Sequence, residues 1–301
     1  MSPKTDAVLP RYPVYIPSKG RYGKEGLTAR FLRKDGVPFK LVVEPKEAYH
    51  YAAAFGKENV IVLPEDDMRL VGSRNFIKAH ATEAGFERHW QFDDNIRMMR
   101  RLYHGKRIPC DAGPALAAIE DYSDRYTNMG ISGPAYTSFV RYANQRKTQP
   151  VLVNVRVYSA SLVNNALPYG WRVYNDDTDF CLQVLGGGWC TALVFVFLID
   201  KVGTMTTKGG NTDQHFADGR LEMARGLERM WPHVVKTDRR FHRPQHAVHD
   251  GWRKFDTPLK LKPGVDLAAL PERDYGLKLK AVKEVQNPTL RNLLSEQEEA
   301  E

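Results

Sequence analysis

The 301-residue chain carries 44 lysines and arginines against 36 acidic residues, which gives a formal net charge of +8. Its 42% hydrophobic content permits a large folded core, and the widely spaced Cys110, Cys181 and Cys190 exclude a disulfide framework or a cysteine-rich zinc site. The longest apolar run, residues 189–199, is too short to cross a bilayer, and residues 1–13 lack a signal-peptide core, so we expect a soluble, cytoplasmic protein.

Three short apolar strands are predicted in the N-terminal part, and each ends in polar side chains. They cover residues 14–21, 39–45 and 59–66, and segments with helical character join them at 24–36 and 45–56. Alternating strands and helices with short links predict an α/β domain with a parallel sheet, whose ligands bind at the carboxyl ends of the strands. The polar side chains at those ends are Ser18, Lys19, Arg21, Glu44 and the run 64–67.

A further strand, in the sequence HWQFDDNI at 89–96, ends in the acidic triplet Asp93, Asp94 and Asn95. Carboxylate and amide oxygens at a strand end suit a hard divalent cation, Mg²⁺ or Mn²⁺, that also binds phosphate oxygens. The alternative is a turn or a helix cap, for which Asp and Asn are equally suited. The preceding residues 72–75, Gly-Ser-Arg-Asn, are predicted to open a helix.

A second acidic cluster lies at residues 176–179, within YNDDTDFCLQVL at 174–185. The apolar spacing after it predicts a helix. Asp177 or Thr178 can cap that helix, and Asp179 complements its dipole. The local pattern is therefore already explained by a helix N-terminus.

The segments VYIPSKGR, VVEP, GSRN and FDDN, in this order and spacing, resemble the GT-A nucleotide-sugar glycosyltransferases. More narrowly, the chain is similar to the TET-associated glycosyltransferases, phage enzymes proposed to glycosylate hydroxymethylated DNA bases, and YNDDTDFCLQVL strengthens this match over roughly residues 12–220. The resemblance implies a GT-A-like, Rossmann-type nucleotide-sugar-binding domain with a mixed central sheet and a basic C-terminal extension. We assign this domain to residues 1–255 and a charged tail, which either packs on it or mediates association, to residues 256–301.

The resemblance also implies a donor site and a metal site. It implies a UDP-sugar donor, UDP-glucose or UDP-GlcNAc, and Mn²⁺ or Mg²⁺ held by Asp93, Asn95 and His215. Glu44 is also compatible with a solvated strand end, His215 with an ordinary loop histidine, and Lys208 with an exposed surface lysine. The implied donor-binding residues are Pro17, Ser18, Arg21, Glu44, Arg74, Asn75, Asp93, Asp94 and Lys208.

In GT-A enzymes an acidic pair at the start of the later helix commonly supplies the catalytic base. The resemblance therefore implies Asp177 as the first candidate for deprotonating the acceptor hydroxyl and Asp179 as the second. This assignment holds for an inverting reaction, because a retaining one does not need the base. Two polar-edged strands, 130–139 and 154–165, are expected to bound the acceptor pocket; their candidate contacts, which are equally compatible with ordinary sheet positions, are Tyr136, Arg156, Tyr158 and Asn164.

Two basic stretches favour a nucleic-acid partner. Residues 96–109 contain no acidic side chain, and residues 233–254 interleave basic side chains with Phe241 and Trp252. Such stretches suit phosphate contacts and base stacking, although most charge runs are simply solvated surface. The candidate DNA contacts are Arg97, Arg100, Arg101, Arg239, Arg240 and Arg243.

The leading hypothesis is a metal-dependent glycosyltransferase that moves a sugar from a UDP-sugar onto a hydroxymethylated pyrimidine, 5-hydroxymethylcytosine, in phage DNA. Its location would then be the cytoplasm of the host cell. The alternative is a GT-A enzyme that acts on a protein, glycan or small molecule. A sugar nucleotidyltransferase would need a longer glycine-rich loop after the first strand than IPSKGR supplies. A non-catalytic nucleic-acid binder would show no metal-dependent binding of UDP.

Overall fold

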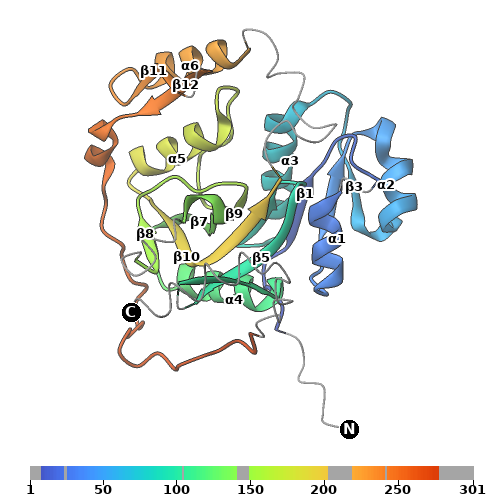
Figure 1. Cartoon of the computed structure of the whole chain (residues 1–301), viewed down its shortest axis with the longest axis horizontal. Coiled ribbons are helices and arrows are strands. Elements are labelled where there is room, and N and C mark those ends of the chain that lie inside the picture. The colour runs from blue at the N-terminus through green and yellow to red at the C-terminus, as the bar shows by residue number, and fades with distance from the viewer. Residues whose placement is uncertain are drawn as a thin grey trace, which may run out of the picture.

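The computed structural model describes residues 8–23, 26–103, 105–140, 149–202, 219–240 and 243–277, and they form an α/β fold around one large mixed sheet (Figure 1). Nine strands follow the order β3-β2-β1-β4-β9-β7-β10-β5-β6, and β8 pairs with β10. The strands are β1 (Val14–Pro17), β2 (Lys40–Val43), β3 (Val60–Val62), β4 (Arg88–Phe92), β5 (Ile96–Tyr103), β6 (Lys106–Cys110), β7 (Met129–Tyr136), β8 (Val151–Val153), β9 (Ala160–Asn164) and β10 (Cys190–Lys201).

The first half of the sheet is parallel, as the sequence predicts. β1 pairs in parallel with β2 on one side and with β4 on the other, and β2 pairs in parallel with β3. The chain therefore leaves β1 in one direction for β2 and β3 and returns to its other side with β4. Such a switch point opens a crevice at the carboxyl ends of β1 and β4, where open α/β sheets bind ligands.

The second half of the sheet is mixed. β9 runs antiparallel to both β4 and β7, whereas β7 and β10 are parallel neighbours. β10 covers the long apolar run at 189–199, which confirms the prediction of a buried strand. This arrangement agrees with the mixed central sheet that the GT-A resemblance implies.

Helices cover both faces of the sheet, so its strands are buried on both sides. Val14 and Ile16 belong to the main core, which also includes residues of α1 (Leu27–Lys34), α2 (Ala48–Phe55) and α4 (Ala112–Ser123). Tyr15, which points to the opposite face, packs under α3 (Arg69–Glu83), and α5 (Asp176–Gly186) covers β7 and β9 through Phe180 and Val184. Burying each such aromatic or branched side chain stabilises the fold by roughly 1.5–3 kcal/mol.

A C-terminal unit packs against α5. Helix α6 (Gly219–Met230) and the hairpin of β11 (Val235–Arg240) and β12 (Arg243–Val248) lie beside α5 (Figure 1). They share an apolar cluster with α5, in which Leu182 meets Leu227 and Val235. The basic stretch at 233–254 thus forms a hairpin and the short helix η6 (Asp250–Phe255). No helix in the described ranges is long and apolar enough to cross a membrane.

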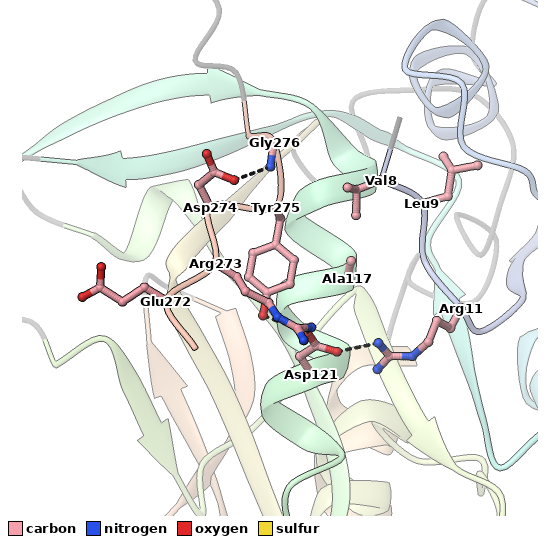
Figure 2. A pocket seen from close by; sticks show the side chains of 10 residues that line it. All are labelled: Val8, Leu9, Arg11, Ala117, Asp121, Glu272, Arg273, Asp274, Tyr275 and Gly276. Carbon is pink, nitrogen blue, oxygen red and sulfur yellow. Dashed lines mark hydrogen bonds and ion pairs between the residues drawn. The ribbon is translucent and has the colours of Figure 1, made fainter. Parts of the chain in front are cut away.

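The described part of the tail, residues 256–277, runs back along the domain to α4 (Figure 1). The amide of Lys260 donates to Asn128 Oδ1 at 2.8 Å, and Tyr275 Oη donates to Asp121 Oδ2 at 2.9 Å. Tail, α4 and N-terminal segment enclose an open cavity of about 1040 Å³, in which Arg11 and Arg273 both pair with Asp121 (Figure 2). The neighbouring Asp124 pairs with Arg88 at the start of β4, so this cavity lies at the end of the strand opposite the acidic triplet.

Candidate active site

The acidic triplet lies at the switch point, directly after β4. Ser18, which follows β1, donates through Oγ to Asp94 Oδ2 at 2.8 Å, and Arg21 forms an ion pair with the same carboxylate. Asp94 is only 7% exposed, and burial raises its pKa despite Arg21 and Ser18. Asp94 thereby connects the turn after β4 to the turn after β1.

Asp93 lies between two cations. Arg74 Nη2 is 3.0 Å from its Oδ1 and Lys201 Nζ is 2.5 Å from its Oδ2. Burial disfavours the carboxylate, but Lys201 and Arg74 outweigh it and lower the pKa of Asp93 to about 2. Asp93 is therefore ionised at neutral pH and collects positive charge at the carboxyl end of β4.

Lys201, the last residue of β10, is a site residue that the sequence reasoning missed. Its Nζ also donates to Ser159 Oγ at 2.8 Å and lies 3.5 Å from Tyr136 Oη. Burial opposes its charge, yet Asp93 keeps its pKa raised. A usable signal was the polar end, Asp-Lys, of a long apolar strand.

Arg74 reaches the second acidic cluster as well. Its Nε is 3.2 Å from Asp176 Oδ2, so one guanidinium faces Asp93 and Asp176 together. α3 begins at Arg69, so Arg74 lies in its second turn and does not open the helix as the sequence suggested. Arg74 therefore contributes positive charge to the site through its own side chain, which is 10% exposed, and not through a helix N-terminus.

Asp176 is the first residue of α5 and was not singled out from the sequence. Burial raises its pKa to about 6, with Asp177 and Asp93 adding to the effect and Arg74 opposing it. A carboxylate with a pKa near neutrality is suited to accept and release a proton. Asp176 therefore joins the candidates for the catalytic base.

Asp177, the first candidate from the sequence, is half-buried beside Asp176 and accepts the amide of Thr178 at 2.8 Å. Arg156 Nη1 donates to Thr178 Oγ1 at 2.7 Å, and His246 Nε2 of β12 lies 3.1 Å from the same oxygen. Burial and the neighbouring Arg156 lower the pKa of His246 to about 4, so its ring is neutral at pH 7. The basic hairpin thus reaches the acidic start of α5.

Asp179, the second candidate, occupies a different environment. Its side chain is 0% exposed, and Arg172 Nε, Gln183 Nε2 and Trp231 Nε1 each donate to it at 2.8 Å. A carboxylate with these donors anchors α5 to the preceding loop and to the end of α6.

The chain that carries this switch-point carboxylate, two cations and second acidic pair also matches a known family in sequence. The model of the TET-Associated Glycosyltransferase family matches residues 12–210. This chain belongs to that family. The protein is therefore a glycosyltransferase with a GT-A-like domain, and no curated protein matches it.

On the expected donor side of this glycosyltransferase, Glu44 follows β2 and forms ion pairs with two lysines. Lys19 and Lys46 each lie 2.9 Å from its carboxylate, and both also pair with the exposed Asp67. Burial opposes ionisation of Glu44, but Lys46 and Lys19 lower its pKa. This edge of the sheet therefore presents two half-exposed ammonium groups beside an ionised carboxylate.

Two other implied donor residues have structural contacts. Pro17 is the buried last residue of β1, next to Ser18. Asn75 donates to the carbonyl of Trp171 at 3.0 Å and accepts its amide at 2.9 Å, so it fastens the loop before α5 to α3. Lys208 and His215 lie outside the described residues.

The fit of a divalent cation rests on two atoms. Asp93 is ionised, and Asn95 Oδ1 is buried without a hydrogen-bond donor from any described residue. Hard oxygen ligands of this kind suit Mg²⁺ or Mn²⁺. Within the described ranges no three His, Cys, Asp or Glu side chains group to hold an ion; a cation here would have Asp93 and Asn95 as its ligands among the described residues.

The expected DNA contacts divide into exposed and engaged arginines. Arg100 pairs with Asp200 at 2.6 Å, and Arg101 donates to the carbonyl of Val196 at 3.1 Å, so both brace β5 against β10. Arg97, at the start of β5, is exposed. Where β11 leads into β12, Arg239 and Arg243 are exposed too, and Arg240 pairs in register with Arg243.

Proposed function

We propose that this glycosyltransferase moves a sugar from a UDP-sugar, UDP-glucose or UDP-GlcNAc, onto the hydroxyl of a hydroxymethylated pyrimidine in DNA, with 5-hydroxymethylcytosine of phage DNA as the acceptor. The observation that supports it is the single guanidinium of Arg74 between Asp93 and Asp176. It joins a charge-rich site for a leaving diphosphate to a carboxylate pair suited to activate a hydroxyl. The reaction would take place in the cytoplasm of the infected host.

The leaving group needs positive charge. As the bond between the anomeric carbon and the phosphate oxygen breaks, its electron pair goes to the diphosphate. Arg74 and Lys201, held on Asp93, are the cations at the switch point that stabilise this charge. A divalent ion held by Asp93 and Asn95, with His215 as a further ligand, would add electrostatic stabilisation of the same leaving group when bound.

The acceptor hydroxyl needs a base. Its oxygen forms the new bond to the anomeric carbon, and its proton passes to a carboxylate of the pair Asp176 and Asp177. Asp176 supports this role through its pKa of about 6 and Asp177 through its partial exposure. Such a single displacement inverts the configuration at the anomeric carbon.

Donor and acceptor would approach from different edges. Ser18, Lys19 and Glu44 follow β1 and β2 and suit the hydroxyls and phosphates of a nucleotide. The exposed arginines Arg97, Arg239 and Arg243 suit DNA phosphates. The formal charge of +8 adds a sequence-independent attraction to the duplex.

The test is a transfer assay with DNA that contains 5-hydroxymethylcytosine, MnCl₂ and a panel of UDP-sugars, read by nucleoside mass spectrometry. We expect a mass increment of one hexose or N-acetylhexosamine on the modified base and none on unmodified cytosine. Release of UDP from one donor without any increment on DNA would reject the DNA acceptor. It would instead favour a protein, glycan or small-molecule acceptor.

A further inference from the structure

Three aromatic rings form a cluster at the carboxyl end of β7. Tyr136 ends this strand, Phe139 lies in the short helix η3 (Thr137–Phe139), and Tyr158 precedes β9. The ring centroids are 5.2 Å apart for Tyr136 and Phe139, 4.9 Å for Tyr136 and Tyr158, and 5.2 Å for Phe139 and Tyr158. Phe139 remains 53% exposed, which is unusual for a phenylalanine in an aromatic cluster.

The cluster is continuous with both halves of the candidate active site. Tyr136 Oη bonds Ser159 and lies 3.5 Å from Lys201 Nζ, the cation on Asp93. On its other side Arg156 lies 4.6 Å from the ring centroid of Tyr158 and donates to Thr178, next to Asp177. An exposed aromatic surface therefore lies between the leaving-group cations and the start of α5.

This location selects the occupant. A hydroxyl that reacts here has to approach the carboxylate pair at the start of α5, and the aromatic cluster links that point to Lys201 through Tyr136 and through Arg156 beside Tyr158. The cluster is therefore the surface on which the ring that carries the hydroxyl can rest. Aromatic side chains flanked by arginine and lysine are the surfaces on which proteins stack nucleobases. A pyrimidine inside a duplex has both faces covered by its neighbours, so it can stack on a side chain only after it leaves the helix.

We propose that the acceptor pyrimidine is extruded from the duplex and stacks on Phe139, with Tyr136 and Tyr158 supporting that ring from behind. The inference rests on the proposed function and adds to it how the base is presented. Loss of stacking on one aromatic ring is expected to raise the KM for the DNA acceptor by about 5- to 150-fold. The donor subsite, at the ends of β1 and β2, should not be affected.

The kinetic test compares Phe139→Ala, Phe139→Tyr and the wild type on the same hydroxymethylated duplex. Phe86→Ala is the matched control, because Phe86 is 38% exposed but precedes the amino end of β4. We expect Phe139→Ala to raise acceptor KM, Phe139→Tyr to restore it, and Phe86→Ala to leave it unchanged. Phe86→Ala should also keep the wild-type rate of UDP-sugar hydrolysis without DNA, and the melting temperature of each Phe139 variant reports whether its fold is preserved.

A second measurement follows extrusion directly. A duplex with 2-aminopurine beside the 5-hydroxymethylcytosine brightens when the neighbouring base leaves the stack. We expect the wild type to raise this fluorescence and Phe139→Ala to raise it less at saturating protein. An unchanged acceptor KM in Phe139→Ala, or a signal that stays flat with an active wild type, would overturn the inference. Absence of transfer to DNA by the wild type would instead reject the proposed function and the inference with it.

Discussion

The Nε atom of Arg74 lies 3.2 Å from Oδ2 of Asp176. This ion pair crosses from α3 to the first residue of α5 and brings the two acidic clusters of the sequence to one guanidinium. A guanidinium can face two carboxylates at once, because its charge is delocalised over three nitrogen atoms. The two halves of the proposed reaction are therefore coupled through a single side chain.

Arg74→Lys should lower kcat about 100-fold, because one ammonium cannot face Asp93 and Asp176 together. The acidic limb of the pH profile should also move to higher pH, since Arg74 lowers the pKa of Asp176. Steady-state kinetics over a pH series measures both effects. Arg172→Lys is the matched control because its guanidinium pairs with Asp179 alone, and it should leave kcat within a few-fold. A lysine at 74 with wild-type kcat would contradict the bridge.

The rate should fall below about pH 6, by about tenfold per pH unit, as Asp176 becomes protonated. A catalytic base must be deprotonated to accept a proton, and burial raises the pKa of Asp176 to about 6, so activity is lost as the pH falls through that value. In Asp176→Asn this limb should disappear or move to lower pH. A limb that stays at pH 6 in the variant would assign it to another group.

Asp177→Asn and Asp179→Asn should separate chemistry from stability. Asp177 is half-buried at the site, so its amide variant should lose about 100-fold or more in kcat while UDP binding and melting temperature are retained. Asp179 is fully buried among Arg172, Gln183 and Trp231, so its variant should lose about 3 kcal/mol of folding free energy and melt roughly 5–10 °C lower. Thermal melts and single-turnover rates distinguish the two. Equal melting losses in both variants would make Asp177 a helix cap.

The sequence was sufficient to bring Ser18, Glu44 and Asp93 to one edge, because parallel strands with short links must align their carboxyl ends. It could not find Lys201, since β10 lies beside β7 in the mixed half, where strand order follows from tertiary packing. The polar Asp-Lys end of that strand is visible in the sequence, but the approach of Lys201 to Asp93 depends on the strand order.

The second acidic cluster illustrates another limit. Asp177 and Asp179 look alike as N-terminal helix residues, but Trp231 and Arg172 determine that Asp179 faces inward. Trp231 follows α6, far along the chain, so no feature of residues 174–185 reports it. The same applies to Arg100 and Arg101, whose exposure depends on the partner strand β10.

Removal of divalent cations should test the role of Asp93 and Asn95. EDTA should abolish transfer, and MnCl₂ should restore it. Asn95→Ala should raise the Mn²⁺ concentration needed for half activity by about tenfold or more. Calorimetric titration of UDP with and without MnCl₂ gives a readout that does not depend on turnover. Full activity in EDTA at saturating donor would leave Arg74 and Lys201 as the sole source of leaving-group stabilisation.

Arg239→Ala and Arg243→Ala should each reduce the slope of log K for duplex DNA against log salt by about 0.9. Each of these exposed guanidinium groups, where β11 leads into β12, would release one phosphate counterion. Fluorescence anisotropy over a salt series measures the slope. The matched control is Lys40→Ala, an exposed cation at the amino end of β2, which should leave the slope unchanged. The ion-pair partners of Asp93 are Arg74 and Lys201 and not these two arginines, so kcat at saturating DNA should also stay near the wild-type value. A slope that both arginine variants retain would remove the hairpin from the DNA interface, and a fall in kcat would show that the hairpin acts on α5 through His246.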